Sequence, residues 1–148
     1  MPREFVNEIS NAFSEWEREG NLMFSETAES PNIVINFVKN NKNESMEYGK
    51  KYVVAYTEPK ISGDILEGMN INFYIQDPEG KNFTRNQIYN TALHEIFHAL
   101  GFMGHSFDPD NIMYLAKDNN SIANDTREVL TEADTSTLQL LYKINPRA

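Results

Sequence analysis

All three histidines of the chain fall in one short stretch, HEIFHALGFMGH, which runs from His94 to His105. His94 and His98 are four residues apart, so on a helix their imidazoles project from the same face one turn apart. Two such imidazoles can bind one metal ion, and catalytic zinc takes three protein ligands with a fourth position open for water. The H-E-x-x-H spacing therefore predicts a zinc site that needs a third ligand from outside the helix.

The neighbouring residues suggest how that site is completed. Gly101 suits the left-handed backbone that ends many helices, and the loop after it can return His105 toward the metal. Glu95 lies about 100° round the helix from His94, so its carboxylate misses the metal and reaches the water beside it. A carboxylate in that position is expected to act as a general base.

A capped helix is expected to carry these residues. Thr84 to Gln87 fits a capping box, and Phe83 can pack on Ile88 as a hydrophobic staple. We therefore expect a helix from Thr84 to Leu100. Its core-facing side consists of Ile88, Ala92, Leu93, Ile96, Phe97 and Leu100.

The chain before this helix shows both helical and strand patterns. Apolar residues at helical spacing predict an amphipathic helix over residues 3–19. Four segments are rich in β-branched and aromatic residues and predict strands. These segments are Leu22 to Ser25, Ile33 to Val38, Tyr52 to Thr57 and Asn70 to Ile75.

Composition sets limits on the class of protein. A chain of 148 residues with 40% hydrophobic residues predicts a single domain over residues 1–148. The net charge of -9 argues against a nucleic-acid partner, and no apolar run approaches the roughly 20 residues of a membrane span. The chain has no cysteine, which excludes disulfides and thiolate zinc fingers. Its first residues lack the apolar core of a secretory signal, which fits an intracellular protein or a mature chain without its leader.

The stretch HEIFHALGFMGHSFDPDNIMY resembles the zinc signature of the matrixins, the matrix-metalloproteinase branch of the metzincin endopeptidases. The resemblance implies that Met113 forms an apolar floor beneath the metal, in a Met-turn. Leu130 to Tyr142 is similar to the closing helix of the family, with Thr131 as N-cap and Asp134 at the N3 position. The implied fold is an α+β zinc protease domain. It comprises a small twisted mixed sheet of about four to five strands, an N-terminal helix, the active-site helix, the Met-turn and a C-terminal helix.

The chain departs from the family pattern just before its third histidine. Phe102, Met103 and Gly104 stand where the family has two residues. One residue adds at most about 3.6 Å of contour, and Gly104 has the freedom to absorb it as a bulge, so His105 remains our third ligand. Related metalloproteases use carboxylates at this place, which leaves three alternatives open: Asp108, Glu128 and Glu132.

The resemblance also bears on cofactors. No histidine remains for the structural zinc site of the family, so we expect one zinc per chain. Calcium is common in the family, but the turn with Asp77 and Glu79 carries no clear calcium motif.

The resemblance implies a zinc-dependent endopeptidase. Glu95 would take a proton from the attacking water and return it to the departing amine. A protein or peptide substrate would lie as an added antiparallel strand along Tyr52 to Thr57. The substrate-binding residues implied there are Val54, Ala55 and Tyr56, and those of the S1′ pocket are Asn90, Thr91, Tyr114 and Leu115. Because the first two pocket residues are polar where typical matrixins have apolar ones, we carry over no preference for large apolar side chains.

Two other functions stay open on the sequence. One is a catalytically inactive zinc protein that binds peptides without cutting them. The other is a gluzincin-type peptidase whose third ligand is a glutamate. We expect a monomer, and the resemblance implies a secreted protein, while the sequence itself leaves a cytoplasmic location open.

Overall fold

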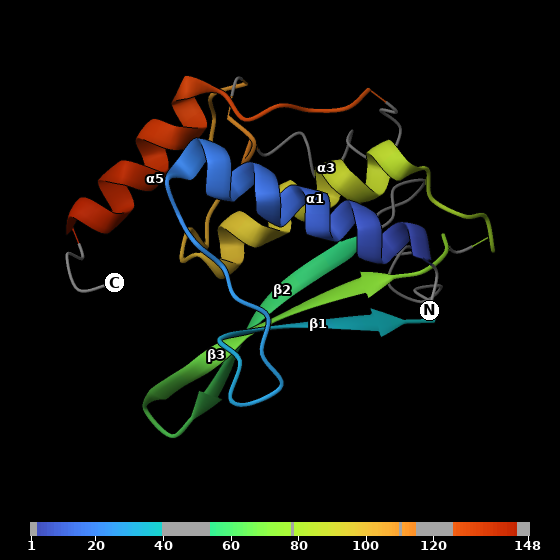
Figure 1. Ribbon diagram of the computed structural model, residues 1–148, viewed down its shortest axis with the longest axis horizontal. Helices are drawn as coiled ribbons and strands as arrows, with labels where there is room; N and C mark the ends of the chain where they lie inside the picture. Colours follow the sequence, from blue (N-terminus) through green and yellow to red (C-terminus); the bar gives the residue numbers. More distant parts are fainter. Residues whose placement is uncertain (1–2, 40–53, 78, 110, 115–125, 145–148) are drawn as a thin grey trace.

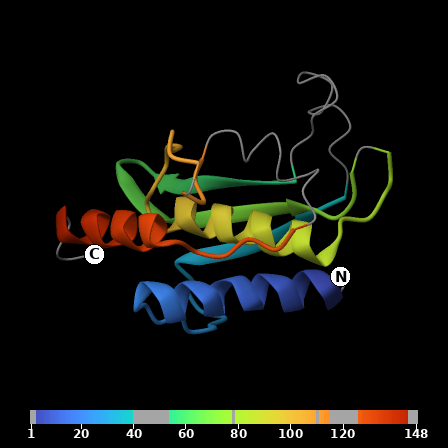
Figure 2. The same cartoon turned by 90° about the horizontal axis from the view of Figure 1, so that it is seen from above.

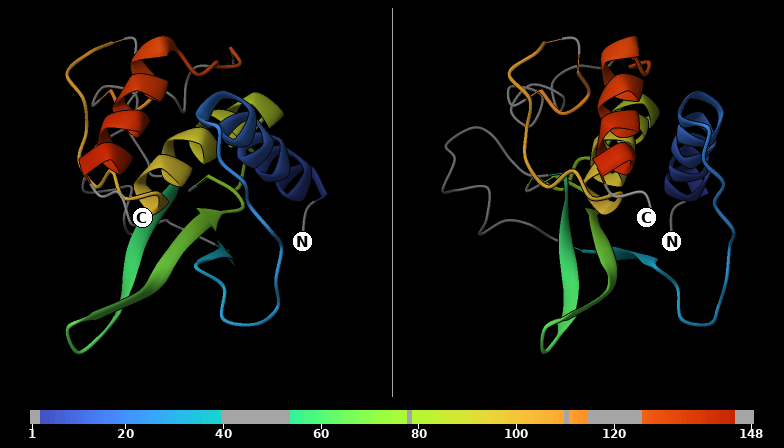
Figure 3. Two further views of the ribbon diagram at one scale, coloured as in Figure 1. Left: turned by 60° about the vertical axis from the view of Figure 1, so that its left-hand side comes forward. Right: turned by 90° about the vertical axis from the view of Figure 1, so that its left-hand side faces the viewer.

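The computed structural model describes residues 3–39, 54–77, 79–109, 111–114 and 126–144. The elements in chain order are α1 (Arg3–Gly20), β1 (Ile33–Val38), β2 (Ala55–Ser62), β3 (Ile65–Tyr74), α3 (Arg85–Ala99) and α5 (Glu132–Ile144). The helices lie together on one side of a small sheet, and the hairpin formed by β2 and β3 extends beyond them (Figure 1; Figure 3). The chain is therefore α+β, as predicted.

The sheet has the strand order β1-β3-β2. β1 runs parallel to β3, with Ile35 opposite Ile71, and β2 runs antiparallel to β3, with Thr57 opposite Ile71. A tight turn with Gly63 at a φ of 63° joins β2 to β3. β2 is therefore an edge strand within the part of the chain that the structure describes.

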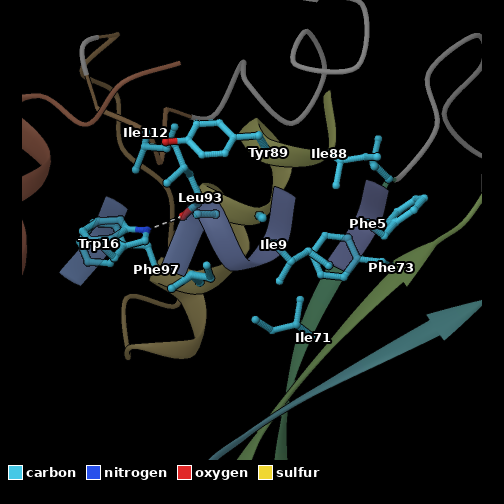
Figure 4. Packing of buried hydrophobic residues seen from close by; sticks show 14 of the residues in the cluster. Phe5, Ile9, Trp16, Ile71, Phe73, Ile88, Tyr89, Leu93, Phe97 and Ile112 are labelled. Carbon is cyan, nitrogen blue, oxygen red and sulfur yellow. Dashed lines mark hydrogen bonds between the residues drawn. The ribbon is translucent and has the colours of Figure 1, made fainter. Parts of the chain in front are cut away.

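Helix α1 lies beside α3, and the two cover the sheet (Figure 2). Side chains from α1, α3 and β3 meet in one core, shown in Figure 4. At one end of this core Trp16 is fully buried, its ring packs 4.7 Å from that of Phe97, and its indole N–H donates to the Leu93 carbonyl at 3.0 Å. Each fully buried large apolar side chain contributes about 1.5–3 kcal/mol, so this core fixes α3 against α1 and the sheet.

The three expected helices are confirmed. Helix α3 begins after Thr84, which forms the predicted capping box with Gln87, and Leu100 is its C-cap. The box satisfies two N–H groups that a helix start otherwise leaves without a partner. Thr131 and Asp134 form a similar reciprocal pair at the start of α5.

The predicted strand from Leu22 to Ser25 is wrong. These residues form no strand; Phe24 instead packs its ring 4.9 Å from that of Phe13, and its N–H donates to the Glu17 carboxylate at 2.9 Å. Phe24 thus faces α1 rather than a neighbouring strand, while Met23 is exposed. The sheet consequently has three strands among the described residues, against the expected four to five.

The limits of β2 and β3 also differ from the prediction. β2 extends to Ser62 and β3 begins at Ile65, because a two-residue turn joins the two strands; their register shifts once, between Lys60 and Ile61. Pro59 is tolerated there since an edge strand can present a residue without an N–H to solvent. Tyr52 and Val53, where the predicted strand began, lie outside the described residues. None of the helices in the described ranges is long and apolar enough to cross a membrane.

Candidate metal centre

Helix α3 and the loop after it bring all three histidines together. The possible ligand atoms of His94, His98 and His105 lie within 4.8 Å of one another. Their ring centroids are 4.9, 5.3 and 5.1 Å apart, which is close to an equilateral triangle. With Zn–N distances of roughly 2.0–2.1 Å and tetrahedral angles, three imidazole centres lie about 5.2 Å apart. The triangle therefore has the size that a zinc ion requires.

The two buried histidines are oriented by backbone carbonyls. His94 Nδ1 lies 2.8 Å from the Ile112 carbonyl oxygen, and His98 Nδ1 lies 2.8 Å from that of Phe102. A carbonyl oxygen only accepts, so each Nδ1 carries the proton and each Nε2 presents a lone pair. Neutral imidazoles held in this tautomer are the usual ligands of protein-bound zinc.

The end of α3 explains how His105 reaches the other two rings. Gly101 has a φ of 118°, a conformation that residues with a side chain rarely adopt, and its N–H donates to the His98 carbonyl at 3.0 Å. The chain then turns back toward α3. Gly104 is not in the left-handed region, so its backbone conformation does not require glycine, and the bulge expected there stays a prediction.

Met113 lies in a tight turn next to this loop. It is fully buried, its N–H donates to the Asn111 side chain at 2.8 Å, and its carbonyl accepts from the Ser106 N–H at 2.7 Å. Ser106 directly follows His105, so this last bond ties the turn of Met113, the predicted Met-turn, to the loop of the third histidine. The turn is thus fixed by one bond to the Asn111 side chain within it and one backbone bond to Ser106.

Helix α5 holds the Met-turn from the other side. The fully buried Asp134 carboxylate accepts the Ile112 N–H at 2.5 Å and the Thr131 N–H at 2.7 Å. The Ile112 carbonyl in turn orients His94. One residue of the turn therefore links the start of α5 to the first histidine.

Glu95 is almost fully buried, with 5% of the residue exposed. The Thr57 hydroxyl, on β2, lies 3.2 Å from a carboxylate oxygen of Glu95 and 3.2 Å from its backbone carbonyl. The edge strand thus contacts the residue between the two helical histidines.

The predicted substrate-binding residues are spread around this centre. Val54 is buried just before β2, and Ala55 and Tyr56 begin that strand. Thr91 is buried on α3 and Tyr114 is half-buried after the Met-turn. Leu115 lies outside the described residues. Their roles stay predictions.

Asn90 makes contacts that the sequence did not reveal. Its buried amide accepts the Glu128 N–H at 2.7 Å and donates to the Thr126 carbonyl at 2.8 Å. It thereby fixes residues 126–128 against α3. A buried asparagine in the middle of a helix must find hydrogen-bond partners, and its type was the one available signal.

The acidic alternatives to His105 lie elsewhere. Among the described residues, the group of possible metal ligands contains the three histidines and no carboxylate. Glu132 is an exposed residue at the start of α5, and Asp108 is exposed on the loop after His105. The sequence analysis missed two contacts between residues far apart in the chain. Thr57 contacts Glu95, and Asp134 contacts Ile112.

Comparison with known proteins agrees with this geometry. The matrixin family model matches residues 1–143. The chain is 32% identical over 115 residues to a probable matrix metalloproteinase 095L of Invertebrate iridescent virus 3, which covers 74% of this chain and 31% of that protein. It is also 32% identical over 151 residues to Metalloendoproteinase 1 of Glycine max, which covers 96% of this chain and 47% of that protein. The chain thus spans less than half the length of these relatives. On the family match, and with the fold and the histidine triangle described above, the chain belongs to the matrixin family.

Proposed function

We propose that this matrixin domain is a zinc-dependent endopeptidase in which His94, His98 and His105 hold one zinc ion and Glu95 is the general base. The observation that carries the proposal is the histidine triangle, with two of its rings already fixed in the ligand tautomer by carbonyl oxygens. Family membership supports zinc metallopeptidase activity at a coarse level. The residue roles are our own assignment.

Zinc, when bound, would supply the Lewis acidity that polarises a peptide carbonyl and acidifies a water molecule. Glu95 takes the proton from the attacking water because its carboxylate stands on the same helix as two of the ligands, one residue after His94. It then delivers that proton to the departing amine, so one carboxylate serves as base and as acid. Its burial excludes bulk water, which strengthens the electrostatic interactions of the carboxylate.

The register of β2 supports an extended substrate on the free edge of the sheet. The Tyr74 N–H donates to the Val54 carbonyl, so alternate residues after Val54 point their backbone groups at β3. Ala55 and Thr57 therefore direct their N–H and C=O groups outward. A peptide added there can form a ladder of backbone hydrogen bonds, and Pro59, which has no N–H, weakens the ladder at its far end.

The S1′ pocket is proposed to involve Asn90, Thr91, Tyr114 and Leu115. Asn90 would influence the shape of the pocket by fixing residues 126–128, because the oxygen and the nitrogen of the Asn90 amide are both hydrogen-bonded to that segment. Its amide then offers little to a substrate side chain, and the pocket wall is set by the segment it holds.

The test combines metal content with cleavage. We expect one zinc per chain and cleavage of a denatured protein substrate that a chelator abolishes. Glu95→Gln should lower turnover by roughly 10²–10⁴-fold and keep its zinc, whereas the matched exposed change Glu67→Gln should alter neither. His105→Ala should lose zinc.

Three results would contradict the proposal. A protein that holds zinc but never cleaves would be a peptide-binding module. Zinc retained in His105→Ala but lost in Glu128→Ala or Glu132→Ala would indicate a gluzincin-type site. A second tightly bound zinc would contradict the stoichiometry.

The location of this activity is proposed on the family resemblance, and the single domain on the length of the chain. We propose that residues 1–148 form one catalytic domain, that it is a monomer and that it acts outside the cell. Limited proteolysis, gel filtration and assay of secreted fractions test these three statements in turn.

A further inference from the structure

Thr57 contacts Glu95 from an element that the zinc signature does not include. The two residues are 38 positions apart, and β2 packs on α3 at this point. The Thr57 hydroxyl lies 3.2 Å from one carboxylate oxygen of Glu95 and 3.2 Å from the carbonyl oxygen of the same residue. One side chain therefore contacts both the main chain and the reactive end of Glu95.

The two distances are equal, so the strength of the acceptor decides in favour of a bond to the carboxylate. A hydroxyl has one proton to donate, and an ionised carboxylate is a stronger acceptor than a neutral carbonyl. Threonine is β-branched and stiff at its first side-chain torsion, so the strand backbone sets the direction of the hydroxyl. Glutamate, in contrast, has three torsions that must be fixed. A donor on a rigid strand can thus restrict the carboxylate to one position.

Thr57 also lies on the proposed substrate edge. By the register of β2 on β3, its N–H and C=O point away from β3, while its side chain contacts α3. The same residue thereby meets the substrate strand with its main chain and the proposed base with its side chain. A substrate that orders β2 would also fix the donor that holds Glu95.

We propose that Thr57 is a positioning residue, which acts through Glu95 by holding its carboxylate in place for proton transfer. The proposal rests on the assignment of Glu95 as the general base. Because the backbone of Thr57, and not its hydroxyl, faces the substrate edge, loss of the hydroxyl should affect the chemical step more than substrate binding.

The first test separates kcat from KM. Thr57→Val keeps the branched shape and removes the hydroxyl; we expect kcat to fall about ten-fold while KM and the zinc content stay unchanged. Thr57→Ser restores the hydroxyl and should recover kcat to within about three-fold of the wild type. Ser62→Ala is the matched control, since it removes a hydroxyl from the exposed end of the same strand. An unchanged kcat in Thr57→Val, or equal losses in the valine and serine variants, would overturn the proposal.

A second test uses the metal-free protein and requires no activity. The side-chain carboxyl NMR signal of Glu95 is identified by its absence in Glu95→Gln. In Thr57→Val this signal should shift and broaden as the carboxylate becomes mobile, and in Thr57→Ser it should stay near its wild-type position. A signal that is identical in all three proteins would contradict a positioning role.

The failure of this inference differs from the failure of the proposed function. If Glu95→Gln abolishes cleavage but Thr57→Val does not lower kcat, the endopeptidase assignment stands and the role of Thr57 is wrong. If the wild-type protein binds zinc without cleaving, the proposed function is wrong, and the NMR experiment still decides whether Thr57 orders Glu95.

Discussion

Replacement of Asp134 by alanine should reduce both the stability of the fold and the affinity for zinc. Its fully buried carboxylate accepts the N–H groups of Ile112 and Thr131. Without it the buried Ile112 N–H loses its acceptor, which lowers the free energy of unfolding by about 1–3 kcal/mol. Helix α5 also loses part of its cap, which lowers it by a further amount of about 0.5–2 kcal/mol. The expected loss of about 1.5–5 kcal/mol is large beside the roughly 5–15 kcal/mol that stabilise a typical domain.

The effect on zinc follows from the other side of Ile112. Its carbonyl orients the His94 ring through the bond to Nδ1. If the peptide shifts once Asp134 no longer holds its N–H, the ring loses its fixed direction and tautomer. Loss of such an outer partner weakens metal binding by about 10–100-fold.

Two measurements on the same variant check this reasoning. Urea unfolding of the metal-free protein, followed by fluorescence of the buried Trp16, gives the free energy of unfolding. Competition with a chelator gives the zinc affinity. Glu132→Ala is the matched control, because it removes an exposed carboxylate from the same first turn of α5 and should cost under about 1 kcal/mol.

Two outcomes would refute the reasoning. Equal losses of stability in Asp134→Ala and Glu132→Ala would mean that burial and the bond to Ile112 contribute nothing. A large loss of stability with unchanged zinc affinity would mean that His94 is oriented independently of α5.

Three further predictions concern the end of α3, the metal and an ion pair between α1 and the segment before α5. Gly101→Ala should lower the free energy of unfolding, measured in urea, by about 1–3 kcal/mol, since alanine is strained at a φ of 118°. Gly104→Ala is the control and should show a smaller loss, because its new methyl group would meet no atom within 4 Å. Equal losses in the two variants would contradict the argument. Zinc at about 100 times its dissociation constant should stabilise the protein by about 2.7 kcal/mol and raise its melting temperature, whereas a melting temperature that does not respond to zinc or a chelator would exclude a native metal site. Arg127→Met should lower the free energy of unfolding in urea by about 1–2 kcal/mol, because it leaves the buried Glu8 carboxylate without the guanidinium 2.7 Å away. The double variant with Glu8→Gln should recover part of this loss. Strictly additive effects of the two changes would contradict the pairing.

Much of helix α3 could be predicted because its signals are local. The capping box of Thr84 and Gln87, the common face of His94 and His98 and the left-handed Gly101 all depend on residues within four positions of one another. Helix geometry converts such spacing directly into position. The sequence thus determined which residues could meet a metal, and from which helix.

Where local pattern competed with packing, the prediction was less secure. The residue types of Leu22 to Ser25 are typical of a strand, yet Phe24 packs against α1 through Phe13 and Glu17, and Met23 is exposed.

Only the tertiary structure decided the contacts between distant segments. Asp134 was readable as a helix cap, but its bond to Ile112 spans 22 residues, and the contact of Thr57 with Glu95 spans 38. No spacing rule predicts such pairs, since they depend on how the helices and the sheet pack together. The sequence by itself determined which histidines could bind a metal and the helix that presents two of them. Packing decided how His105, the turn of Met113 and the edge strand are placed around these two histidines.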